Sequence, residues 1–291
     1  MEQQFPEIKT KSLPAVKNAV REIYARLFPS GRLQFIDEAF RWIEDAFAGR
    51  YADYQRIDAK YHDLEHTLQV TLCFVRLLEG YQSAGSQPQL TQRAFELGLL
   101  AILLHDTGYL KKLSDTEGTG AKYTLVHVSR SADFAAALLK EKGFPLPDVR
   151  AVQNMIRCTG VNADLRSIPF QGELEKKVGF ALGTADLLGQ MAADDYVEKL
   201  SILYQEFEES NRYHPNPNTE GFNNATELKR KTPVFWESYV IPKISNDFLG
   251  LYHFLNRPYP NGANYYLQCI KANIERLHNE LGLPGEVAAV P

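Results

Sequence analysis

The sequence of 291 residues predicts an all-α fold, a single-domain bundle of about ten helices. Apolar residues recur three and four positions apart along most of the chain, which is the spacing of one face of a helix. Long runs with the period-two alternation of β-strands are hard to find. Hydrophobic residues make up 44% of the chain and charged residues 23%, a composition typical of a globular protein with a sizeable core.

The expected helices follow one another with mostly short interruptions. The first ends at a Pro-Ser-Gly stop, and Thr91 is a plausible cap for the fourth. The fourth is apolar nearly all round between Leu97 and Leu104, as a helix at the centre of a bundle would be. The expected ranges are 13–28, 33–47, 64–78, 91–106, 125–142, 148–159, 174–191, 194–209, 234–249 and 264–281.

Two longer interruptions shape the expected organisation. Residues 107–122 hold three glycines among polar residues, which predicts a mobile loop. Residues 211–224 hold two prolines, one glycine and five asparagines, which predicts an irregular excursion. We expect three parts of one domain: N-terminal helices over 1–50, a core over 51–210, and the excursion with aromatic-rich helices over 211–291.

The bulk properties exclude several classes of protein. A net charge of −4 and a pI near 6.0 offer no general attraction to nucleic acid. The most apolar run, Leu97–Leu104, is far shorter than the roughly 20 residues needed to cross a bilayer. Met1–Lys11 does not resemble a signal peptide, so we expect a cytoplasmic protein without membrane partners. The three dispersed cysteines, Cys73, Cys158 and Cys269, argue against disulfides or a thiolate zinc site.

Two histidines, His62 and His66, stand four residues apart. On a helix this spacing places both imidazoles on one face about one turn apart, so that both could reach one ion. With Glu65 between them they also match H-x-x-E-H, the inverted zinc-peptidase motif. In that alternative Glu65 would be the general base and both histidines would bind zinc.

Acidic residues in apolar surroundings give a second indication of a metal site. His105 and Asp106 end the most apolar helix of the chain, and Asp186 stands in a stretch with few other polar side chains. Burying an imidazole and carboxylates is costly unless something compensates, and a metal ion would do so. Exposure of the helix end to solvent, or a salt bridge from Asp186 to a basic residue, would be the ordinary explanations.

The order His, then His-Asp, then Asp, each part on its own expected helix, resembles the HD-domain superfamily of metal-dependent phosphohydrolases. The resemblance covers about residues 61–196. It implies a metal site at the centre of the bundle, with the ligands His66, His105, Asp106 and Asp186.

The opening Tyr61-His62-x-x-x-His66 is similar to that of cyclic-nucleotide phosphodiesterase catalytic domains, which implies that His62 is the general acid. Asp63 departs from the asparagine that is usual there. A His-Pro-Gly run is also missing, since Thr107-Gly108-Tyr109 follows the His-Asp pair. These departures leave open whether the substrate is a cyclic nucleotide.

Three further residues are weaker candidates. By the same resemblance His127 would reach a second metal or the phosphate, although an ordinary helix position is equally compatible. Members with two metals often carry more histidines one helix later, and residues 155–159 hold none. Arg157 and Lys111 could neutralise a substrate phosphate, unless they are simply solvated.

We therefore expect hydrolysis of a small phosphomonoester or phosphodiester, a nucleotide being one candidate, with His62 and Asp106 as catalytic residues. One divalent ion would bind tightly and a second more weakly. Mixed nitrogen and oxygen ligands suit Mn, Fe, Co, Ni or Zn, and Mg suits a weaker site. The alternatives are the zinc peptidase and a non-catalytic HD-like domain that senses a ligand.

Overall fold

The computed structural model describes residues 5–161, 163–215 and 222–282, and within them the fold is all-α, as predicted. Its strands are β1 (Asn256–Arg257) and β2 (Ala263–Asn264), which form one short antiparallel pair. Across these described ranges, no helix combines the length and hydrophobicity needed to span a lipid bilayer.

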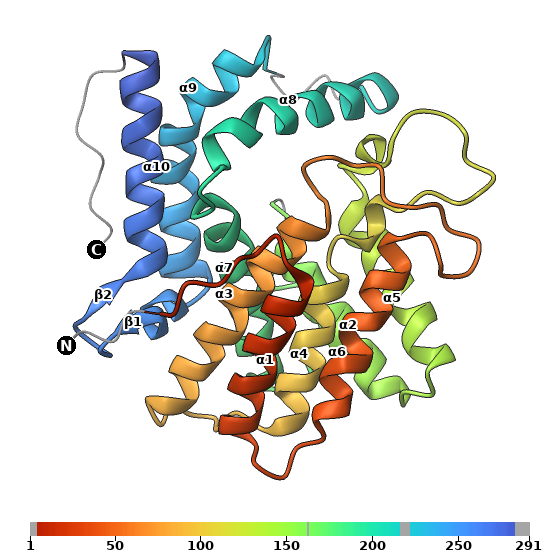
Figure 1. Ribbon diagram of the computed structural model, residues 1–291, viewed down its shortest axis with the longest axis vertical. Helices are drawn as coiled ribbons and strands as arrows, with labels where there is room; N and C mark the ends of the chain where they lie inside the picture. Colours follow the sequence, from red (N-terminus) through yellow and green to blue (C-terminus); the bar gives the residue numbers. More distant parts are fainter. Residues whose placement is uncertain (1–4, 162, 216–221, 283–291) are drawn as a thin grey trace.

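Ten α-helices build the described part of the domain (Figure 1). They are α1 (Leu13–Leu27), α2 (Leu33–Phe47), α3 (Leu64–Ser83), α4 (Gln92–Leu104), α5 (His127–Glu141), α6 (Leu146–Ile156), α7 (Glu173–Met191), α8 (Tyr196–Tyr213), α9 (Ala225–Phe235) and α10 (Tyr265–Leu281). Short turns join them: η1 (Thr107–Tyr109), η2 (Gly120–Tyr123), η3 (Arg157–Thr159), the π-helical η4 (Trp236–Val240) and η5 (Lys243–Asp247), and η6 (Leu251–Leu255).

Helices α3, α4 and α7 form the centre of the bundle. Two glycines allow them to approach closely: a Cβ at Gly189 of α7 would lie 2.8 Å from the Cα of Val70, and one at Gly98 of α4 would lie 2.6 Å from Val178 Cγ1. Larger side chains at either glycine would force the helices apart. This close packing brings together the three segments that carry the predicted metal ligands.

Helices α8, α9 and α10 form a second group on one flank, where α9 and α10 run side by side (Figure 1). Asn273 of α10 ties this group to the centre, because its side-chain amide donates to the carbonyl oxygens of Met191 and Ala193 at 2.9 Å each. The domain therefore has one continuous core from α1 to α10.

The helix expected over 234–249 begins much earlier than predicted, at Ala225. The Asn224 side chain accepts from the backbone N–H of Glu227 at 2.9 Å and caps the helix there. Pro233 stands inside α9, and the chain continues beyond it in the π-helical turns η4 and η5. A proline removes one backbone hydrogen bond, and wider turns of this kind accommodate such a loss.

The two expected interruptions also differ from prediction. Residues 107–122 are not irregular throughout, because they contain η1 and the start of η2, and their buried side chains include Tyr109 and Ala121. In the second interruption, α8 extends to Tyr213, and residues 216–221 lie outside the described residues.

Candidate metal centre

The centre of the bundle holds a cluster of possible metal ligands. His66 on α3, with His105 and Asp106 after α4, each offers one ligand atom, and these atoms lie within 4.8 Å of one another. All three side chains are at most 4% exposed. This buried group could hold a metal ion.

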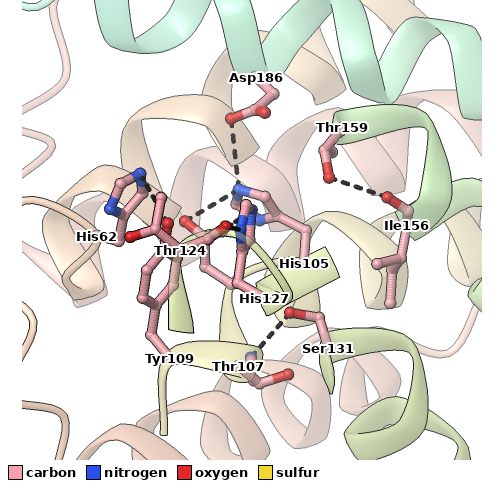
Figure 2. A network of polar contacts seen from close by, with 12 residues as sticks. His62, His105, Thr107, Tyr109, Thr124, His127, Ser131, Ile156, Thr159 and Asp186 are labelled. Atoms are coloured by element: carbon pink, nitrogen blue, oxygen red, sulfur yellow. Dashed lines mark hydrogen bonds and ion pairs between the residues drawn. The ribbon is translucent and has the colours of Figure 1, made fainter. Parts of the chain in front are cut away.

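Asp186 on α7 lies against the same cluster (Figure 2). Its Oδ1 is 3.5 Å from His66 Nε2 and 3.4 Å from His105 Nε2. Asp106 Oδ2 is at 3.2 Å and 3.3 Å from the same two nitrogens. Asp106 and Asp186 therefore both lie within 3.5 Å of the same two imidazole nitrogens, and the four side chains come from three separate segments.

The hydrogen bonds of the cluster leave ligand atoms free. His105 Nδ1–H donates to the carbonyl oxygen of Ile102 at 2.7 Å, so its Nε2 is directed at the carboxylates. His105 Nε2 and Asp106 Oδ2 are both buried without a hydrogen-bond partner. Buried polar atoms of this kind are costly, and a cation between them would satisfy both. Fixing a ligand histidine through its other nitrogen is also common at metal sites.

Contacts between the imidazoles and the carboxylates stabilise the charged form of each. Burial opposes the charge of His66, but contacts with Asp106 and Asp186 outweigh it and raise the pKa of His66 to about 10. Burial likewise opposes ionisation of Asp186, but contacts with His105 and His66 lower the pKa of Asp186 to about 2. The carboxylate is thus ionised at neutral pH, the form in which it binds a cation.

His62 lies beside the cluster but not on α3. The Asp63 carboxylate accepts from the backbone N–H of His66 at 2.9 Å and caps α3, which begins at Leu64. The prediction that His62 and His66 share a helix face is therefore wrong. The cap fixes where α3 starts, and His62 reaches the site from the preceding turn.

Glu206 on α8 holds His62 in place, a role the sequence did not predict. His62 Nδ1–H donates to Glu206 Oε2 at 2.6 Å, while Oε1 accepts from the backbone N–H groups of Lys60 and Tyr61 at 2.7 and 2.8 Å. Burial raises the pKa of Glu206, but the charge of His62 and these donors outweigh it and lower the pKa below its usual value. A buried carboxylate thus fixes the position of the His62 ring.

Tyr109 packs against two histidines at the edge of the cluster, and the ring centroids of these histidines are 6.1 Å apart (Figure 2). Its ring stacks on His62 at 4.3 Å and 11° and on His127 at 4.7 Å and 23°. His127 Nδ1–H donates to the carbonyl oxygen of Thr124 at 2.6 Å, and its Nε2 lies 3.8 Å from Asp106 Oδ1. The structure therefore places His127 beside the cluster. Burial lowers the pKa of His127, which keeps its imidazole neutral.

The two candidate phosphate-binding cations have protein partners. Lys111 is buried, with its Nζ 2.9 Å from Asp58 Oδ2 and donating to the Gly118 carbonyl oxygen. Arg157 is exposed and donates to Asn154 Oδ1 at 2.9 Å. Both contacts lie outside the cluster of imidazoles and carboxylates.

Glu65, the general base of the peptidase alternative, also has partners outside the cluster. Its Oε2 is 3.2 Å from Lys199 Nζ, and its Oε1 accepts from Gln69 at 3.2 Å. These contacts do not favour the peptidase motif. The three cysteines, for their part, are free thiols.

One comparison with known proteins gives a match. A family model described as Npun_R2479-like matches residues 15–256, a range that contains every residue of the cluster. No curated protein matches the chain.

Proposed function

The chain belongs to the Npun_R2479-like family, and we propose that it is a metal-dependent phosphohydrolase. The divalent ion would be held by His66, His105, Asp106 and Asp186. The observation that carries the proposal is the pair of buried atoms without hydrogen-bond partners, His105 Nε2 and Asp106 Oδ2, in a cluster of two imidazoles and two carboxylates. Mn, Fe, Co, Ni or Zn suits this mixed set of ligands.

When bound, such an ion lowers the pKa of a water and polarises a phosphoryl group. The chain would add a proton donor. With His62 Nδ1–H bound to Glu206, the other nitrogen, Nε2, remains for a substrate. His62 is also more exposed than the ligands, at 14% against 1% for His105. A histidine on an ionised carboxylate is well suited to general acid catalysis near neutral pH.

The proposed reaction is hydrolysis of a phosphoester. The oxygen of a water bonds to phosphorus as the bond from phosphorus to the leaving oxygen breaks. His62 gives its Nε2 proton to the leaving oxygen and is reprotonated through solvent by the proton that the water loses. Atoms and charge therefore balance without any other reactant.

The order of the ligands along the chain supports the proposal through its resemblance to the HD-domain superfamily. Asp63 departs from the phosphodiesterase pattern, but its observed role is to cap α3. Asparagine caps a helix equally well. The difference at position 63 therefore does not argue against the same chemistry.

The test combines elemental analysis of the purified chain with a panel of phosphoesters under added Mn²⁺, Fe²⁺, Co²⁺, Ni²⁺, Zn²⁺ and Mg²⁺. We expect about one tightly bound ion per chain and hydrolysis that a chelator abolishes. A chain that binds metal but hydrolyses no phosphoester would instead be the ligand-sensing alternative. A chain that binds no ion would contradict both.

The Glu65→Gln variant separates phosphoester hydrolysis from the remaining alternative, the zinc peptidase. Glu65→Gln should leave phosphoester hydrolysis nearly unchanged, because Glu65 contacts Lys199 rather than the cluster. Peptide hydrolysis by the wild type that Glu65→Gln abolishes would instead favour the zinc peptidase.

A further inference from the structure

The Tyr109 ring contacts two histidines of the site, so its position affects theirs. It stacks on His62 and His127, with ring centroids 4.3 and 4.7 Å away, and its side chain is fully buried. Tyr109 stands on η1, a turn of three residues that begins directly after Asp106. A turn this short makes few hydrogen bonds of its own. Contacts from other segments therefore decide where the ring lies.

Arg130, on the first turn of α5, holds the backbone on both sides of Tyr109. Its Nε donates to the carbonyl oxygen of Gly108 and its Nη2 donates to that of Leu110, at 2.7 Å each. Both donors belong to one planar guanidinium, whose geometry is fixed. One side chain therefore fixes two carbonyl groups relative to α5, and the residue between them is Tyr109.

The Tyr123 ring fixes the guanidinium in turn. The Arg130 Cζ lies 3.5 Å from the centroid of that ring, a cation–π contact that suits the flat guanidinium. The Tyr123 hydroxyl donates to Asp115 Oδ2 at 2.5 Å, so the ring is itself anchored. The guanidinium is thus held on its face by Tyr123 and along its edge by the two carbonyl groups.

Close packing completes the hold on η1. The Gly108 N–H donates to Ser131 Oγ at 2.8 Å (Figure 2). A Cβ at Gly108 would lie 2.0 Å from the His127 carbonyl oxygen, so the turn lies directly on the start of α5. On its other side, a Cβ at Gly120 would lie 2.0 Å from the Tyr109 carbonyl oxygen. The turn is therefore enclosed between α5 and η2.

A substrate phosphate would be another ligand for a partly buried arginine such as Arg130. Its Nε and Nη2, however, already donate to backbone carbonyl oxygens. A phosphate could gain these donors only by releasing the turn that carries Tyr109. Holding the turn is therefore the role that the contacts of Arg130 support.

We propose that Arg130 is a positioning residue, which holds η1 so that the Tyr109 ring keeps His62 and His127 in the orientation that hydrolysis requires. This inference rests on the proposed function and deepens it. The effect of Arg130 passes through the two carbonyl groups to the Tyr109 backbone, and from the ring to the two imidazoles. Arg130 acts through this ring rather than on the substrate.

Arg257 gives a matched control, because it makes the same kinds of contact elsewhere. Like Arg130 it is partly buried, and its Nη1 donates to the carbonyl oxygens of Phe254 and Asn256 at 3.1 and 3.2 Å. Its guanidinium also lies over a phenylalanine ring, at 4.7 Å from the centroid. Its Nη2 is 3.8 Å from Glu79, which is about 20 Å along α3 from the metal ligand on that helix.

The first test observes the histidine rings by NMR, without turnover. With isotope-labelled histidine, the ring signals of His62 and His127 are identified by replacing each with alanine. Tyr109→Leu removes the aromatic ring stacked on both and should displace both signals. Arg130→Ala should displace the same two signals in the same direction, with Zn²⁺ and with a chelator, whereas Arg257→Ala should not. Unmoved signals in Arg130→Ala would overturn the inference.

The second test measures turnover of the ion-loaded chain on the phosphoester that it hydrolyses fastest. Arg130→Ala should lower kcat about tenfold with ion content and KM nearly unchanged, as loss of a partner that orients an active-site group does. In a Tyr109→Leu background the same change should cost about twofold or less, because the two changes disrupt one arrangement and do not add. Arg257→Ala should leave kcat unchanged. An undiminished loss in the Tyr109→Leu background would overturn the inference.

Arg130→Lys keeps the inference testable if Arg130→Ala unfolds. It retains the charge but not the rigid fork of donors, and should give the same changes at smaller size. Displaced signals of His62 and His127 in a chain that hydrolyses no phosphoester would support the positioning role and contradict the proposed function. Hydrolysis by a chain whose signals do not move in either Arg130 variant would do the reverse.

Discussion

The site has an inner and an outer part that differ in how the fold builds them. The inner part consists of His66, His105, Asp106 and Asp186 from the central helices, and the first three of these side chains are at most 4% exposed. The outer part, in which His62 and His127 are 14% and 20% exposed, depends on hydrogen bonds and ring stacking between segments far apart in sequence. The inner part fits a metal, and the outer part fits proton transfer to a substrate.

Under the proposed function, this difference should separate ion binding from turnover. Inner side chains are fixed by packing that the whole bundle shares, so changing them should affect the ion and stability together. Outer side chains are fixed by a few contacts, chiefly with Glu206 and Tyr109. Changing those should reduce turnover while the ion stays bound.

The largest effect is expected from Asp186→Ala in the inner part. Removing one of two carboxylates should abolish ion binding and hydrolysis together. In the wild type a chelator should lower the melting temperature by about 5 °C if the ion is present at about 100 times its Kd, and in the variant the chelator should have no effect. Elemental analysis and thermal unfolding measure both.

The control is Asp194→Ala, an exposed aspartate just past α7. This variant should retain the ion content and the activity of the wild type, and the chelator should lower its melting temperature as it does for the wild type. If Asp186→Ala kept its full ion content, Asp186 would not be a ligand, and α7 would contribute nothing to ion binding.

The second largest effect is expected from His62→Ala. Turnover should fall by about 10² to 10⁴, the usual cost of losing a general acid. The loss should be smallest for an activated leaving group such as 4-nitrophenolate, which needs little protonation. Ion content should not change, since His62 binds Glu206 rather than the cluster. Loss of the ion together with activity would make His62 a ligand and erase the distinction between the two parts.

The sequence predicted the inner part because its signal is local. His105 and Asp106 directly follow an apolar stretch, and Asp186 is an isolated carboxylate in another. Each is therefore recognisable as a polar residue in apolar surroundings from its immediate sequence neighbours. The helical periods likewise predicted α2 and most of α7 closely, since burial of one face sets that pattern.

The outer part could not be predicted in this way. Glu206 stands on a helix with many charged residues, and its contact with Lys60 spans 146 positions of sequence. Only the packing of α8 brings the two together. The start of α3 at the Asp63 cap and the start of α9 at Asn224-x-x-Glu227 did carry capping signals. The expected range 64–78 starts at Leu64, as α3 does, whereas the expected range 234–249 missed the signal at Asn224.

A smaller effect is expected from Glu206→Gln. Turnover should fall by about 10- to 100-fold, as it does when a hydrogen-bond partner that orients an active-site histidine is removed. Unchanged turnover would mean that Glu206 only anchors the backbone of Lys60 and Tyr61.

The same variant also tests the acid stability of the fold. Because the pKa of Glu206 is lowered in the folded state, its contribution to stability is present above its ordinary value of 4.5 and is lost as pH falls through the folded value. The free energy of unfolding should therefore decline more steeply below about pH 4.5 in the wild type than in Glu206→Gln. Denaturant titrations at several pH values measure this.

The smallest effect is expected from Tyr109→Phe, since the Tyr109 hydroxyl is 3.5 Å from His62 Nε2, too long for a strong hydrogen bond. The ring keeps its stacked contacts with both histidines, and turnover should fall about twofold at most. Tyr109→Leu removes both stacked contacts, each worth about 1 kcal/mol, and should cost about tenfold or more in kcat with the ion retained. If Tyr109→Phe were as slow as Tyr109→Leu, the hydroxyl and not the ring would matter. The outer part would then contain a second proton donor beside His62.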